Sequence, residues 1–239
     1  MKYVCVISVI LLCRLASAQL SVDSIDLDRI PQRKIRSYLT MQKEREVNYL
    51  SDFRASCFSS IPYTDYTSMK NTYLIKQNPD SVWQVYQNTS VSESWNGKRI
   101  SCGLLFSKWN EEICYYNQHF NSGVDTGQLF FINLRSMKGM LNLPLGVEVV
   151  DVYPIQKRIA FSYLEGNKSQ GEQIIQFKKT TDGFTQIVHI SNFKSDSKFR
   201  DKHLYPFFHT RVINEFHRNM AGHITNDRHV FEVIGKEML

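Results

Sequence analysis

Alternating apolar and polar residues fill the middle of the chain and predict strands. Between residues 100 and 106 every second side chain is apolar, which is the two-residue period of a half-buried strand. Comparable patterns bounded by turn residues predict further strands at 73–76, 113–120, 127–134, 147–152, 159–165, 172–178 and 184–193. Asp182-Gly183, just before the last of them, is a hairpin signal. Short connections of this kind favour a meander of antiparallel strands.

A helical period replaces the alternation near the C-terminus and predicts one long helix. Pro206 suits the start of this helix and Gly222 its end. With 100° per residue, the apolar side chains share one face about 140° wide, made of Phe208, Val212, Ile213, Phe216 and Met220. Arg211 and Arg218 point the other way. We therefore expect this helix to bury a broad stripe against the strands.

A shorter helical segment follows the first predicted strand. Asn78 can cap it, Pro79 fits its first turn, and Asp80 suits the positive end of the helix dipole. The aromatic residues of this region are Trp83, Tyr86 and Trp95. They are predicted either as core residues or as a platform for a ligand at the mouth of a cavity.

Both ends of the chain depart from the strand pattern. Residues 19–61 carry Pro31 at a helix start and a short apolar stripe with Ile35 and Leu39, which predicts one or two amphipathic helices leaning on the main domain. A partly ordered linker is the alternative for this extension. Residues 223–239 form a predicted C-terminal tail.

The first 18 residues have the pattern of a secretory signal peptide. Lys2 supplies the charged start, residues 3–13 form an apolar run, and Ala16-Ser17-Ala18 is a small-residue cleavage site. The apolar run is too short to span a bilayer, and an uncleaved anchor is the alternative. We therefore expect a secreted or periplasmic protein that begins near Gln19.

The composition narrows the class of protein further. The chain has 239 residues, 42% of them hydrophobic and 22% charged, which fits one domain plus an extension and excludes a collagen-like or disordered chain. Its formal charge is +6, and loss of Lys2 and Arg14 leaves 27 basic residues against 23 acidic ones, or +4. This mild excess allows weak attraction to an anionic membrane surface. We expect no nucleic-acid binding, because there is no dense basic stripe.

Cysteine and asparagine add two open questions. Outside the predicted signal peptide the cysteines are Cys57, Cys102 and Cys114. An oxidising compartment would permit one disulfide, and Cys102 with Cys114 on consecutive predicted strands is one possible pair. Glycosylation sequons at Asn88 and Asn167 matter only if the source glycosylates secreted proteins.

The order of elements resembles the helix-grip fold of the START-like and pollen-allergen-like superfamily, often labelled polyketide cyclase and lipid-transport proteins. The resemblance rests on Tyr73-Leu74-Ile75-Lys76 followed by Asn78-Pro79-Asp80-Ser81-Val82-Trp83, and on the last strand, 183–189, leading into the helix after Tyr205-Pro206. It covers about residues 62–222, between the signal peptide with its extension and the tail.

The resemblance implies an α+β architecture in which a curved antiparallel sheet wraps the long C-terminal helix and leaves a cavity between them. Proteins of this superfamily mostly bind lipids, sterols or other apolar compounds, and some are cyclases. Because one fold serves many functions, function must be argued from the site.

His209 is the most informative candidate residue, because it lies inside the apolar stripe of the long helix. It is either a core histidine that hydrogen-bonds to the sheet, a polar anchor for a ligand, or a general base. His189 on the last strand is its candidate neighbour. His209 and His217 are about 12 Å apart along a helix, so they cannot share a metal ion directly. We predict no metal and no cofactor, because no ligand-spacing or phosphate-loop motif occurs.

These features predict a binding protein for a hydrophobic or amphipathic, lipid-like small molecule. Such a site needs a cavity of at least about 300 Å³. The predicted ligand-binding residues are His209, His189, Phe208, Val212, Phe216, Trp83 and Tyr86. The alternatives are a cyclase- or hydrolase-type enzyme with a cavity histidine as acid or base, and a cavity-poor interaction module. Catalytic residues, ligand identity and oligomeric state stay open.

Overall fold

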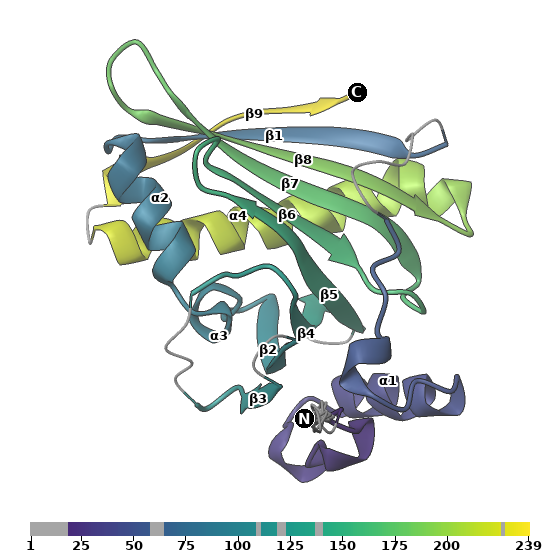
Figure 1. Ribbon diagram of the computed structural model, residues 1–239. Helices are drawn as coiled ribbons and strands as arrows, with labels where there is room; N and C mark the ends of the chain where they lie inside the picture. Colours follow the sequence, from purple (N-terminus) through teal and green to yellow (C-terminus); the bar gives the residue numbers. More distant parts are fainter. Residues whose placement is uncertain (1–18, 58–64, 109–110, 119–122, 137–140, 226–227) are drawn as a thin grey trace, which may run out of the picture.

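A curved antiparallel sheet organises the chain (Figure 1). The computed structural model describes residues 19–57, 65–108, 111–118, 123–136, 141–225 and 228–239. Within them the sheet has nine strands in the order β3-β2-β4-β5-β6-β7-β8-β1-β9. The strands are β1 (Thr67–Ile75), β2 (Ile100–Ser107), β3 (Glu112–Tyr115), β4 (Gln128–Ser136), β5 (Leu141–Tyr153), β6 (Arg158–Tyr163), β7 (Ser169–Lys179), β8 (Thr185–Ser195) and β9 (Phe231–Met238).

Four α-helices accompany the described strands. They are α1 (Arg33–Glu44), α2 (Pro79–Asn88), α3 (Val91–Ser94) and α4 (Tyr205–Ile224). Shorter helical turns are η1 (Val22–Ser24), η2 (Leu27–Arg29), η3 (Leu50–Asp52), the π-helical η5 (Arg200–Leu204) and η6 (Arg228–Val230). The start of α2 follows its sequence, because the Asn78 side chain accepts a hydrogen bond from the Asp80 backbone N–H at 2.8 Å.

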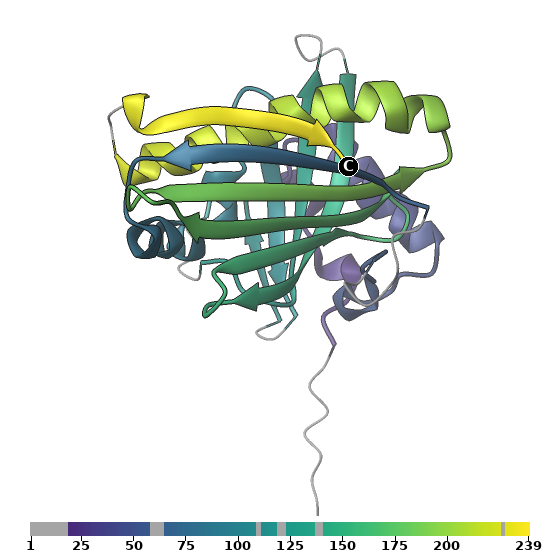
Figure 2. The same ribbon diagram turned by 90° about the horizontal axis from the view of Figure 1, so that it is seen from above.

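The helix α4 crosses one face of the sheet, and α2 and α3 lie near one end of it (Figure 2). Its apolar stripe packs into the main core, where Val212, Phe216 and Met220 meet side chains of the strands. Burial of the stripe removes apolar surface from water and so stabilises the fold. The predicted helix-grip fold, with its N-terminal helical extension, is confirmed.

The N-terminal extension forms a second core on the opposite face of the sheet. Residues of α1 and its flanking turns pack on β2 and β4, with Leu39 against the cluster that contains Phe131. The contact is close at Gly103, where an added Cβ would lie 2.6 Å from Cδ1 of Ile35. The extension is therefore part of the packed structure.

The predicted C-terminal tail contains a strand instead. β9 pairs with the free side of β1, and the Phe231 ring stacks on Tyr73 with 5.6 Å between centroids. Most side chains of β9 are exposed. The sequence therefore lacks the alternation by which a strand is recognised, and no strand was predicted in this tail.

None of the three described cysteines forms a disulfide, so the Cys102–Cys114 bridge is absent. The pairing of β2 with β3 sets Leu105 opposite Cys114, which displaces Cys102 from it along the strand. The predicted signal peptide, residues 1–18, lies outside the described residues, as do residues 119–120 of the predicted strand 113–120. Residues 116–118 form a turn after β3, so the strand is shorter than predicted. Among the helices that are described, none is long and apolar enough to cross a membrane.

Candidate functional site

Two histidines of α4 face the sheet. His217 is completely buried, although its helical position predicted only the edge of the apolar stripe. His209 is half-buried as a residue, while its Nδ1 atom has no contact with solvent. Both rings pack against His189 of β8, with centroids 5.2 Å away for His217 and 5.9 Å for His209. Three imidazoles thus meet between α4 and the sheet.

A chain of hydrogen bonds runs through these histidines. The Tyr86 hydroxyl of α2 bonds to Nδ1 of His217 at 2.8 Å. Nε2 of His217 bonds to Nδ1 of His189 at 2.9 Å, and Nε2 of His189 bonds to Oε1 of Gln173 at 3.0 Å. The Gln173 Nε2 donates to the hydroxyls of Tyr163 and Tyr205, each at 3.2 Å. The chain links α2, α4, β8, β7 and β6.

Burial controls the charge of these groups. Desolvation lowers the pKa of His189 to about 3 and holds the pKa values of His209 and His217 well below the ordinary value. The neighbouring histidines add to the lowering for His209 and His217. Desolvation also raises the pKa of Tyr163 to about 12. All members are therefore neutral at physiological pH.

Because these groups are neutral, the donor and the acceptor of each hydrogen bond in the series can be assigned. Because Oε1 of Gln173 only accepts, Nε2 of His189 must carry that ring's proton, and its Nδ1 must accept. Nε2 of His217 therefore donates to His189, and Nδ1 of His217 accepts from the Tyr86 hydroxyl. The Ser191 hydroxyl donates to the same Gln173 oxygen at 2.6 Å. Every donor from Tyr86 to Gln173 points the same way along the chain.

The chain borders a cavity of about 30 Å³ between α4 and the sheet. Its lining is mainly apolar and consists of Trp95, Ile132, Leu134, Leu145, Val147, Phe161, Tyr163, Gln173, His189, His209, Val212 and Ile213. This volume holds a water-sized group. The expected cavity of at least about 300 Å³ is not met.

Aromatic side chains explain the small volume. Trp95 stacks on Phe216 with 4.4 Å between ring centroids and lies 5.6 Å from Phe130. Phe130 meets Phe161 edge to face at 5.9 Å. These rings occupy space between the sheet and α4, where a larger cavity was expected.

His209 differs from the other two histidines in its hydrogen bonding. Its ring stacks on Tyr205 at 4.9 Å and lines the cavity. Its buried Nδ1 has no hydrogen-bond partner among the described residues. A buried polar atom left without a partner costs about 1–3 kcal/mol. His209 is therefore the member of the cluster that can gain most from a ligand.

The predicted ligand-binding residues separate into three groups. His209, His189 and Val212 line the cavity. Phe216 packs in the core against Trp95, a lining residue. Phe208 is half-buried and meets Phe207 edge to face at 5.1 Å.

The two aromatic residues predicted on α2 lie in the core. Trp83 and Tyr86 both contact Phe177 edge to face, at 5.6 and 4.8 Å. Neither lines the cavity as it stands. Tyr86 nevertheless takes part in the site, because its hydroxyl ends the hydrogen-bond chain at His217.

Sequence reasoning missed several members of the chain: His217, Gln173, Ser191, Tyr163 and Tyr205. One signal was available in β7, where Gln173 shares a strand face with Ile175 and Phe177. A glutamine in line with two buried apolar residues indicates a satisfied polar group in the core.

Metal binding has no support in the side chains that the structure describes, where no group of three or more His, Cys, Asp or Glu is arranged to hold an ion. The His189 and His217 ring nitrogens are both occupied by hydrogen bonds within the chain.

The grip of a curved sheet on α4 defines a helix-grip protein. Solved structures with this outline include a major latex-like protein from Panax ginseng, with a TM-score of 0.49, 11% identity, and coverage of 67% of this chain and 99% of that one. Another is truncated norcoclaurine synthase from Thalictrum flavum, at 0.49 and 11%, covering 70% and 100%. A conserved protein from Geobacillus kaustophilus follows at 0.45 and 13%, covering 66% and 94%.

Comparison at the level of sequence gave no relatives. A scan against family models found no match, and neither did a comparison with curated proteins.

Proposed function

We propose that the protein is exported, after loss of residues 1–18, and binds a small amphipathic molecule between the sheet and α4. The polar group of the ligand would bond to His209, and its apolar part would lie among the side chains of the cavity. What supports the proposal is the lining of the cavity, since its volume of about 30 Å³ holds only a water-sized group while α4 stays in place.

One observation carries the proposal, namely the unpartnered Nδ1 of His209 beside a cluster that is otherwise satisfied. His189, His217 and Gln173 all have hydrogen-bond partners. A ligand hydroxyl or acid group at His209 would remove the cost of that buried atom. The ligand would leave the hydrogen bonds among His217, His189 and Gln173 intact.

Binding of anything larger than water requires α4 to move at its first turns. From Tyr205 to Thr210 most of the helix is only half-buried, whereas the following segment from Val212 is buried. The π-helical turn η5 precedes it, and such turns often lie at functional sites. The first turns of α4 are therefore the part of the cavity wall that is least costly to displace.

The test uses anilinonaphthalene sulfonate, a fluorescent amphipathic anion, as the probe. His209→Leu removes the polar atom and keeps an apolar side chain, so we expect affinity for the probe to fall about tenfold, the effect of one lost hydrogen bond. His223→Leu, on the exposed last turn of α4, is the matched control and is expected to bind as the original protein does. Equal affinity in all three proteins would contradict the proposal.

Native mass spectrometry of the protein from its own compartment is a second test. We expect a small molecule to co-purify with the protein and to be recovered by organic extraction. A mass equal to that of the bare chain in repeated preparations would count against a carrier.

Acid–base catalysis is the second candidate, favoured by the continuous chain that reaches the cavity through Gln173 and His189. A general acid or base works best with a pKa near the working pH. Burial lowers the pKa of His189 to about 3, so at neutral pH this ring has no proton to give as an acid and is a weak base. Binding is therefore preferred. Mass spectrometry can follow a co-purified molecule during incubation with the protein. If the molecule is chemically converted, catalysis becomes the preferred function.

A further inference from the structure

Exposed apolar side chains are most numerous on the segment that leads into α4, on its first turn and on β9. On the N-terminal extension, where a partner-binding module would need them, Met41 and Tyr49 are the exposed large ones among the described residues. Many more lie on the turn before α4, on its first turn and on β9. We call this set the α4–β9 patch, and its apolar members are Phe199, Leu204, Phe207, Val233, Ile234, Met238 and Leu239.

The two elements of the α4–β9 patch touch each other. The Lys236 ammonium of β9 donates to the Pro206 carbonyl of α4 at 2.9 Å. Further along, the Arg218 guanidinium lies 5.9 Å from the centre of the Phe231 ring. The strand β9 and the side of α4 that faces it therefore lie next to each other, as Figure 2 shows.

Basic side chains lie between the apolar ones. At 100° per residue Phe207, Arg211 and Arg218 fall within an arc of about 40° on α4. The Arg211 guanidinium covers the Phe207 ring at 3.8 Å. The basic members of the patch are Lys198, Lys202, Arg211, Arg218 and Lys236, all of them exposed.

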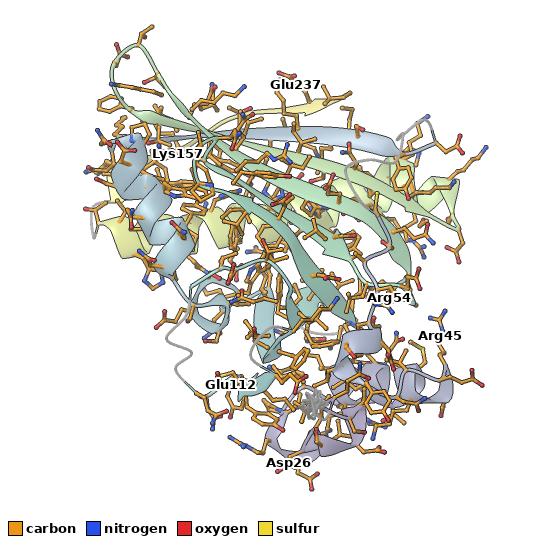
Figure 3. All side chains as sticks on the ribbon, in the orientation of Figure 1. Asp26, Arg45, Arg54, Glu112, Lys157 and Glu237 are labelled. Carbon is orange, nitrogen blue, oxygen red and sulfur yellow. The ribbon has the colours of Figure 1, made fainter. Side chains whose placement is uncertain are left out.

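The described acidic residues near the patch are engaged elsewhere. On β9, Glu232 pairs with Lys76 at 2.5 Å and Glu237 pairs with Lys70 at 2.8 Å. Glu237 is seen at the edge of the sheet formed by β9 (Figure 3). Before α4, Asp196 pairs with Arg200 at 2.6 Å. The patch therefore combines apolar side chains with a positive charge that these carboxylates do not cancel.

From this combination we infer that the α4–β9 patch docks the protein on an anionic lipid bilayer. A bilayer offers diffuse negative charge at its surface and an apolar phase within reach of single side chains, which matches both components of the patch. A second copy of the chain is disfavoured as occupant, because it would bring Arg211, Arg218 and Lys236 against their own kind.

Two exposed phenylalanine rings mark where insertion begins. Phe199 is 65% exposed, and Phe207 is 48% exposed on the first turns of α4. Their rings reach the depth of the headgroups while Lys198 and Lys202 meet the lipid phosphates. This places the N-terminal end of α4 against the membrane.

The test is flotation of the protein, purified from the full chain, with vesicles of phosphatidylcholine alone or with about 30% phosphatidylserine. We expect at least about tenfold stronger binding to the anionic vesicles at low salt, decreasing as salt is added. Two variants lower it by about the same factor: Phe199→Ser, which removes an inserting ring, and Arg211→Glu, which reverses a charge.

Matched controls separate the patch from general effects. Ile155→Ser changes a 92% exposed apolar residue between β5 and β6, and Lys34→Glu reverses an exposed charge on α1. Both controls are expected to bind as the original protein does, and all variants to keep its melting temperature, because the changed side chains are exposed.

Three results would overturn the inference. The first is equal binding of patch variants and controls, and the second is binding that ignores phosphatidylserine and salt. The third is no vesicle binding together with a dimer in solution that Phe199→Ser dissolves, which would make a second copy the occupant. None of these measurements uses probe binding at His209, so this inference and the proposed function can fail separately.

Discussion

Gln173 is the residue that joins the histidines to the tyrosines. Its amide oxygen accepts hydrogen bonds from His189 and Ser191, and its amide nitrogen donates to the hydroxyls of Tyr163 and Tyr205. Gln173→Leu leaves these groups buried without their partner, so we expect the free energy of unfolding to fall by about 3 kcal/mol or more. Urea unfolding of both proteins measures this.

The matched control lies three residues further along the same strand. Gln176 is half-buried on the opposite face of β7. Gln176→Leu is expected to change stability by less than about 1 kcal/mol. Similar losses for the two variants would mean that the buried chain adds nothing to stability.

The two sequon asparagines also differ. The Asn167 side chain donates to the carbonyls of Gly146 and Leu164 at 2.7 and 2.9 Å and accepts from the Gly146 N–H at 3.2 Å. Asn167→Gln is too long to keep these bonds and should cost about 2 kcal/mol. Asn88→Gln, at the exposed end of α2, should stay within about 0.5 kcal/mol. Thermal melting compares the two, and the reverse order would contradict this account.

At the scale of elements, the contact of α4 with β8 should make stability depend on pH. The three buried histidines have lowered pKa values in the folded protein, whereas the unfolded chain takes up protons near pH 6.5. Their contribution is fully present above pH 6.5. It is lost as the pH falls toward the folded values, by about 1 kcal/mol per pH unit for each histidine.

Urea unfolding between pH 7.5 and about pH 4.5 measures this slope. His217→Gln is expected to make it shallower, because one buried imidazole is removed. His203→Gln is the control, since His203 is exposed on the turn before α4. A slope that His217→Gln leaves unchanged would place the acid sensitivity in other groups.

Most of the helices and strands could be predicted from the sequence, whereas β9 could not. The strands of the meander and α4 have strong periods, and the structure contains each of these elements, although β1 and β5 begin six residues earlier than predicted and β3 ends at Tyr115. β9 has no period, because most of its side chains, on both faces of the strand, are exposed. Its place in the sheet depends on pairing with β1, far away in the chain, which no local pattern records.

The candidate site was predictable only in part. His209 and His189 could be found as polar residues at apolar positions. His217, Tyr163 and Tyr205 could not be grouped with them, because their meeting depends on how α4 is rotated over the sheet. The cavity was overestimated because the sequence contains the aromatic residues but does not say whether they line or fill it.

For the whole molecule, the sheet with a core on each face should unfold as one unit. Leu39 of α1 is completely buried in the second core. Leu39→Ala should lower the stability of the entire protein by about 2–4 kcal/mol. Met41→Ala, on the same helix but 36% exposed, should cost much less. Tryptophan fluorescence and far-ultraviolet circular dichroism should give one shared transition; two separate ones would mean that the extension unfolds on its own.

The pairing of β1 also bears on the order in which the sheet can assemble. Thr67 at the start of β1 lies opposite Phe193 of β8, and Met69 lies opposite Met238 of β9. Both neighbours of β1 come much later in the sequence than β1 itself, so this part of the sheet closes only through contacts between distant segments, which form slowly. Until β8 and β9 have paired with it, both edges of β1 are open to pairing with strands of other chains, and folding conditions that favour this early species should favour aggregation.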